Sequence, residues 1–116
     1  MKNVIVMMSF LLALVCSCSP KGTPSGHAEE DARAFAKEIF AAYDADNVVE
    51  MKKTIDVYYE FYKNQPETDI KVFFNVWKEE LETKIDAGKI DPTKMGTMAQ
   101  EADKYGKLDE LYKRVR

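Results

Sequence analysis

Apolar residues recur at intervals of three and four positions from residue 27 almost to the C-terminus of this 116-residue chain. One clear run is Val48, Met51, Ile55, Tyr58 and Tyr62, whose successive spacings are 3, 4, 3 and 4. Because an α-helix has 3.6 residues per turn, this spacing places the five side chains on one helical face. No segment alternates with the two-residue period of a half-buried strand. The pattern therefore predicts an all-α fold.

Capping and turn residues divide this pattern into helices joined by short loops. The expected helices are 27–45 with Ser25 as N-cap, a second that follows Asp46 or Asn47 and ends near 64, a third from Pro66 to Gly88, and a last segment that starts at Asp91-Pro92. The last segment is either two short helices or one kinked helix, because two glycines weaken it. The prediction is a compact bundle of four or five short antiparallel helices over 27–116.

The third expected helix has the strongest apolar stripe in the chain, formed by Ile70, Phe73, Phe74, Trp77, Leu81 and Ile85. A wide apolar stripe faces the core of a helical bundle. We therefore expect this helix to be the most buried one.

The N-terminus has the three parts of a secretory signal peptide. Lys2 gives a basic start, the 12 residues 4–15 are apolar except for Ser9, and small or sulfur residues follow at 16–18. The apolar run is too short to span a hydrocarbon core, which takes about 20 residues. This segment indicates export from the cytoplasm.

The end of the signal resembles the lipobox of bacterial lipoproteins, in which an aliphatic and a small residue precede an acylated cysteine. For Cys18 these positions hold Val15 and Ser17, whereas the alternative register on Cys16 inverts the preference. The resemblance covers residues 1–18 only. It implies cleavage after Ser17 and thioether-linked and amide-linked acyl chains, palmitate among them, on Cys18. An ordinary secretory signal cut nearby, which would release a free domain, is the alternative.

If the resemblance holds, the mature chain starts with acylated Cys18 and a flexible Pro- and Gly-rich tether over 18–26. Two or more acyl chains give stable membrane anchoring. Position 19 is serine, so the aspartate that retains enterobacterial lipoproteins in the inner membrane is missing, and the first acid is Glu29. The resemblance thus implies anchoring in the cell envelope, at the outer membrane, with the domain facing the periplasm.

Composition and motifs argue against several classes of function. With 17 basic and 20 acidic residues, the net charge of −3 is unsuited to nucleic acid. The chain has one histidine, His27, so a zinc site lacks ligands, and no phosphate-binding glycine loop or catalytic constellation occurs. We expect no metal, no cofactor apart from the lipid on Cys18, and no enzymatic activity.

The aromatic residues of the second and third expected helices are the one feature that could serve for more than packing of the core. They are candidates for a partner or ligand surface because exposed aromatic side chains anchor interfaces. The candidates are Tyr58, Tyr59, Phe61, Tyr62 and Trp77. The sequence favours a non-enzymatic, lipid-anchored periplasmic module that binds another envelope protein or peptide, as adaptor, subunit or inhibitor. The alternative is a lipoprotein that holds a small apolar molecule or a glycan between these helices.

Overall fold

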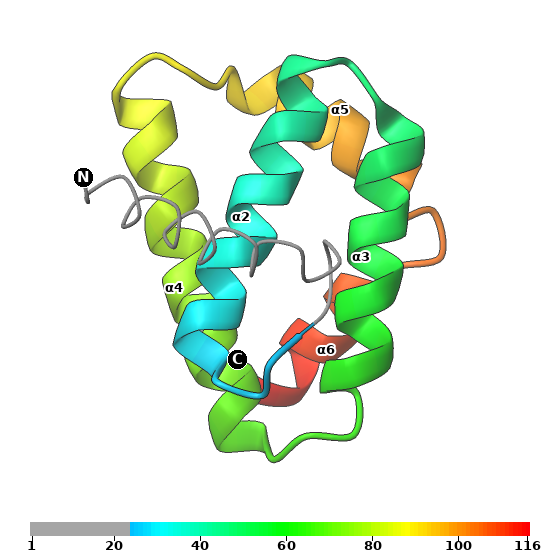
Figure 1. The fold of residues 1–116 in the computed structure, drawn as a ribbon. Coiled ribbons are helices and arrows are strands. Elements are labelled where there is room, and N and C mark those ends of the chain that lie inside the picture. The colour runs from blue at the N-terminus through cyan, green and yellow to red at the C-terminus, as the bar shows by residue number, and fades with distance from the viewer. Residues whose placement is uncertain (1–23) are drawn as a thin grey trace, which may run out of the picture.

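A computed structural model describes residues 24–116 of the chain (Figure 1). Its five helices are α2 (Ala28–Asp44), α3 (Val48–Tyr62), α4 (Glu67–Asp86), α5 (Pro92–Ala102) and α6 (Lys107–Val115). No strand occurs in the described range, so the predicted all-α bundle is confirmed, with two helices in its last segment. The predicted signal peptide, Cys18 and the first part of the predicted tether lie outside the described residues.

Side-chain capping explains where two of the five helices, α3 and α5, begin. The Asn47 side chain accepts a hydrogen bond from the Glu50 N–H at 3.1 Å, and Asp91 accepts one from the Thr93 N–H at 3.0 Å. Both bonds satisfy donors that the first turn of a helix leaves free. The prediction of Ser25 as N-cap of the first helix is wrong. The N-cap is His27, which makes no side-chain capping bond.

Helix α2 lies at the centre of the bundle and packs on α3 and α4. Eight of its residues are buried, whereas α4 buries Ile70, Phe73 and Phe74. The expectation that α4 would be the most buried helix is therefore wrong. The second half of its apolar stripe is only partly covered, because α5 packs chiefly on α3 and makes little contact with α4.

The centre of the core is an aromatic cluster around Phe35 of α2. Its ring centroid lies 5.2 Å from that of Tyr58, 5.3 Å from Phe73 and 5.1 Å from Trp77. The contacts with Tyr58 and Trp77 are edge-to-face, the arrangement that the charge distribution of aromatic rings favours. This cluster joins α2, α3 and α4.

The bundle has two distinct ends (Figure 1). The proximal end, as we call it, holds the start of α2, the loop between α3 and α4, and the end of α6. The distal end holds the turn between α2 and α3 and the loop between α4 and α5, where the Asp91 N–H donates to Tyr43 Oη at 2.8 Å.

No helix within 24–116 has the length and hydropathy needed to cross a membrane.

Candidate functional site

An open apolar cleft of about 630 Å³ lies where α4, α5 and α6 meet. Exposed polar side chains, Lys78, Gln100 and Asp109, stand among the residues that line it. The rest of the lining is mainly apolar and comes from four helices. These residues are Ile55, Phe74, Trp77, Leu81, Ala99, Leu108 and Tyr112, with Gly96. We call this feature the α4–α6 cleft.

A recess of about 310 Å³ adjoins the α4–α6 cleft. The two share Trp77, Leu81 and Leu108 in their linings, and the recess also contacts Met51 and Met95. No charged side chain lines the recess. Together the cleft and the recess give a concave surface with the apolar character that ligand and peptide sites have.

The cleft exists because small residues of α5 face large residues of α4. Gly96 and Ala99 line it on the α5 side, and nothing lies within 4 Å of the point where a Cβ on Gly96 would be. Opposite, the Trp77 ring is held by an edge contact with Phe35 and by stacking on Phe40, with centroids 5.7 Å apart. The wall is therefore pre-formed, because its largest side chain is fixed by neighbours in the core.

Of the five predicted surface residues, only Trp77 lines this cleft. Tyr58 and Tyr62 are 2% and 1% exposed and belong to the core, so they offer no side-chain surface to a partner in this structure. Tyr59 and Phe61 are both partly buried, but they pack at separate sites on the bundle. The structure thus does not bring the five aromatic residues together as one surface.

Tyr59 ties α3 to α6. Its hydroxyl donates to Glu110 Oε1 at 3.0 Å, and the ammonium groups of Lys63 and Lys107 lie 5.7 Å and 5.5 Å from its ring centroid. The hydrogen bond to Glu110 is the main reason that the pKa of Tyr59 is raised. Lys107 also pairs with Asp56 of α3 at 3.1 Å. Tyr59 thus contacts α6, the helix that borders the cleft, through an exposed hydrogen bond.

Tyr62 belongs to a buried polar cluster that the sequence pattern did not indicate. The carboxylate of Asp31, which is 3% exposed, accepts hydrogen bonds from Ser25 N–H (2.8 Å), Ser25 Oγ (2.8 Å), Gly26 N–H (3.0 Å) and the Tyr62 hydroxyl. We call these four residues the Asp31 clasp. It fixes the end of the predicted tether on α2 and links both to α3.

The hydrogen bonds of the Asp31 clasp determine its charge state. Burial raises the pKa of Asp31, but the bonds from Tyr62, Ser25 and Gly26 outweigh burial and hold it below its ordinary value of 3.8. Burial, followed by the hydrogen bond to Asp31, raises the pKa of Tyr62. At neutral pH the clasp therefore holds a carboxylate and a neutral phenol.

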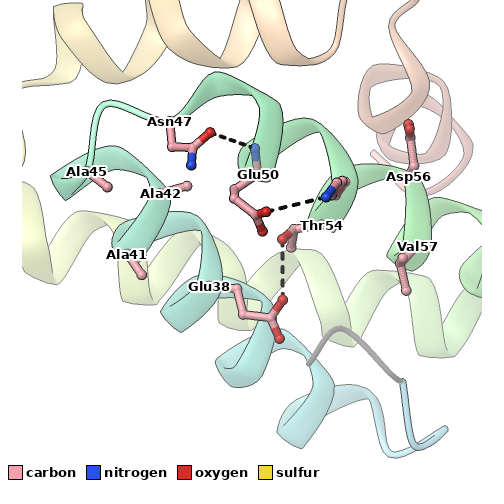
Figure 2. A pocket seen from close by; sticks show the side chains of 10 residues that line it. Glu38, Ala41, Ala42, Ala45, Asn47, Glu50, Thr54, Asp56 and Val57 are labelled. Atoms are coloured by element: carbon pink, nitrogen blue, oxygen red, sulfur yellow. Dashed lines mark hydrogen bonds and ion pairs between the residues drawn. The ribbon is translucent and has the colours of Figure 1, made fainter. Parts of the chain in front are cut away.

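A second concavity, of about 550 Å³, lies between α2 and α3 (Figure 2). Ala41, Ala42 and Ala45 line it from α2. Several of its polar groups bond to one another: Thr54 Oγ1 donates to Glu38 at 3.3 Å, and Lys53 pairs with Glu50 at 3.5 Å. This groove offers small side chains and satisfied polar groups, whereas the α4–α6 cleft offers large apolar ones.

Nothing in the described part of the chain gathers three or more His, Cys, Asp or Glu side chains in a way that would hold a metal ion. The sequence matches no protein-family model, and the comparisons with curated proteins and with solved structures return no match.

Proposed function

We propose that the chain is a lipid-anchored, non-enzymatic module of the cell envelope that binds an apolar segment of another envelope protein or peptide in the α4–α6 cleft. The open apolar cleft is the observation that carries this proposal. Apolar concave surfaces that remain open to solvent in a folded domain are typical of interaction sites. The lipobox-like sequence around Cys18 supplies the anchor and the compartment.

The lining of the cleft favours a segment with one apolar face. Such a segment, laid as an amphipathic helix in a groove, buries anchor side chains spaced three and four apart. Trp77 and Leu81 are themselves four apart on α4 and would contact those anchors. The exposed groups of Lys78 and Asp109 would then meet the polar edge of the segment, as charged groups do at the rim of an interface.

A small apolar molecule is the second candidate occupant, and the recess is the observation that favours it. Its volume of about 310 Å³ lies at the lower limit of ligand pockets. Met51 and Met95 in its wall are flexible side chains that adapt to irregular shapes. The lack of charged groups there favours an apolar molecule over a glycan.

Site-specific photocrosslinking in cells tests the proposal. A photoreactive phenylalanine analogue at Gln100, in the cleft, is compared with the same analogue at Lys53, in the groove between α2 and α3. We expect one dominant protein adduct from position 100, none of it from position 53, and its loss in a Cys18→Ala background. Equal adducts from both positions, or none from position 100, would contradict a partner in the cleft.

A Gly96→Leu variant separates the two occupants. The position is helical and has open space beside it, so the leucine side chain fills the cleft mouth without removing a core contact. If a partner segment binds, the adduct from position 100 is lost in this variant. If a small apolar molecule binds, native mass spectrometry of the purified protein shows a bound mass that the variant lacks, with no protein adduct in cells.

A further inference from the structure

We infer that the Asp31 clasp fixes the point at which the membrane tether leaves the domain, and that the proximal end of the bundle therefore faces the membrane. The inference rests on the proposed function, because it requires the lipid on Cys18. It adds the orientation in which the module presents its cleft.

The clasp holds the chain at two consecutive residues by main-chain and side-chain bonds. The N–H groups of Ser25 and Gly26 both donate to Asp31, and Ser25 Oγ adds a third bond. Gly26 has φ of +93°, a conformation that favours glycine, and the nearest atom to a Cβ there would be Phe61 Cζ at 3.8 Å. The path of the chain is thus set at residue 25, against α2 and α3.

The remaining tether, even when fully extended, is no longer than the bundle. Seven residue steps separate Cys18 from Ser25. At ~3.3–3.6 Å per residue they reach at most about 25 Å. The 20 residues of α4, which runs from the proximal to the distal end, span about 30 Å. The proximal end therefore lies nearer to the bilayer on average than the distal end does.

This orientation determines how the α4–α6 cleft runs relative to the membrane. Phe74, nearer the start of α4, and Leu81, nearer its end, both line the cleft, so it follows the helix away from the proximal end. An occupant that lies along α4 would extend outward from the membrane surface. The surface that meets lipid headgroups would be the proximal end, with the loop between α3 and α4.

Energy transfer to the bilayer tests the orientation. The full-length protein, processed and lipidated in a bacterial host, is labelled with a donor dye at Asn64→Cys or Lys89→Cys, exposed loop positions at the proximal and distal ends. It is then reconstituted in phosphatidylcholine vesicles that contain an acceptor-labelled lipid. We expect greater transfer from position 64 than from position 89.

Two variants test the part that the clasp plays. Asp31→Asn should narrow the difference between the two positions, because the amide nitrogen cannot accept the bonds from Gly26 and Tyr62 and the carboxylate charge is lost. Residues 25 and 26 are then held less firmly, which lengthens the effective tether. Glu30→Gln, a change at the exposed neighbouring acid, should leave it unchanged. If Asp31→Asn fails to fold, Ser25→Ala is used in its place, because it removes one clasp bond. The comparison of positions 64 and 89 in the native background tests the orientation in either case.

The outcomes separate the two proposals. Protein that is recovered outside the vesicles and lacks acyl chains overturns the anchored function together with the orientation. Protein that is anchored but transfers equally from both positions, or more from position 89, overturns the orientation alone. An unchanged difference in both clasp variants would overturn the role of the clasp.

Discussion

The Asp31 clasp makes a quantitative prediction for Tyr62→Phe. The Tyr62 hydroxyl donates to a carboxylate that is nearly inaccessible to solvent, and three further donors come from Ser25 and Gly26. Phenylalanine keeps the ring and its edge contact with Phe61, at 5.0 Å between centroids, and removes only the donor. The variant therefore isolates one charge-assisted hydrogen bond.

The expected cost follows from the type of bond. A hydrogen bond to a charged group contributes about 1.5–3 kcal/mol, and three donors remain on Asp31 in the variant. We therefore expect the free energy of unfolding to fall by about 1.5 kcal/mol, at the lower end of this range. In a domain of this size, 1 kcal/mol shifts Tm by about 4–8 °C, so Tm should fall by about 6–12 °C.

Urea unfolding followed by circular dichroism, at pH 7, measures this loss. Tyr59→Phe is the matched control, since it removes the hydroxyl that bonds to Glu110 on the exposed side of the same helix. Exposed pairs of this kind contribute little. The control should therefore retain the native midpoint. A Tyr62→Phe midpoint that matches the control would refute the reasoning.

The pH dependence of the stability difference gives a second test, and its direction follows from the pKa of Asp31. The pKa of Asp31 is lowered in the folded state, so its contribution is complete above its ordinary value of 3.8 and is lost as pH falls through the folded pKa. The stability difference between native and Tyr62→Phe protein should therefore be constant near neutral pH and shrink as pH falls through the folded pKa of Asp31. A difference that grows on acidification would contradict the assigned charge state.

Five other predictions concern the helices, the core, the surface and the anchor. Gly96→Ala should stabilise the protein by up to about 1 kcal/mol in urea unfolding, because the site is helical with open space. Gly106→Ala should destabilise it by about 1–2 kcal/mol, since φ there is +69°. Phe35→Ala should cost about 3–5 kcal/mol. Removal of the exposed Tyr105 side chain (79% exposed) should leave the midpoint unchanged. Cys18→Ala should move the protein from the membrane fraction to the soluble fraction, and retention in the membrane would contradict the lipid anchor.

Helix limits were accessible from the sequence because they depend on local signals. The spacing of apolar residues, the capping side chains of Asn47 and Asp91, and the glycine that follows α4 all act within one or two turns. The Ser25 prediction failed because the helix begins only at Ala28, with His27 as N-cap. The Ser25 hydroxyl instead accepts from the His27 N–H and donates to Asp31, six residues along the chain.

How far each helix is buried depends on which other helices pack on it, and the spacing of apolar residues does not indicate those partners. The apolar stripe of α4 contains large side chains, but the residues of α5 that face it are as small as Gly96 and Ala99. Half of the stripe therefore lines a cleft. Tyr58 and Tyr62 share one face of α3 and are buried, where both rings also pack on Phe73 of α4. Tyr59 and Phe61 lie off that face and are only partly buried. The packing of neighbouring helices therefore decides how far each aromatic side chain is covered.

The burial of the Asp31 carboxylate likewise could not be predicted from the sequence. In the sequence it is the last of three acids in a first helical turn, where the helix dipole favours negative groups. Its neighbours Glu29 and Glu30 are exposed, while Asp31 is enclosed by residues from the predicted tether and from α3. That enclosure depends on a contact 31 positions along the chain.

The position of Trp77 has a spectroscopic consequence. It is the only tryptophan in the chain, and it lies where the α4–α6 cleft meets the recess. Indole emission depends on the polarity around the ring, so displacement of water from the cleft by any occupant should shift the emission of the unmodified protein to shorter wavelength. The native chain thus contains its own optical reporter of binding, and candidate peptides and apolar molecules are accessible to titration without a label.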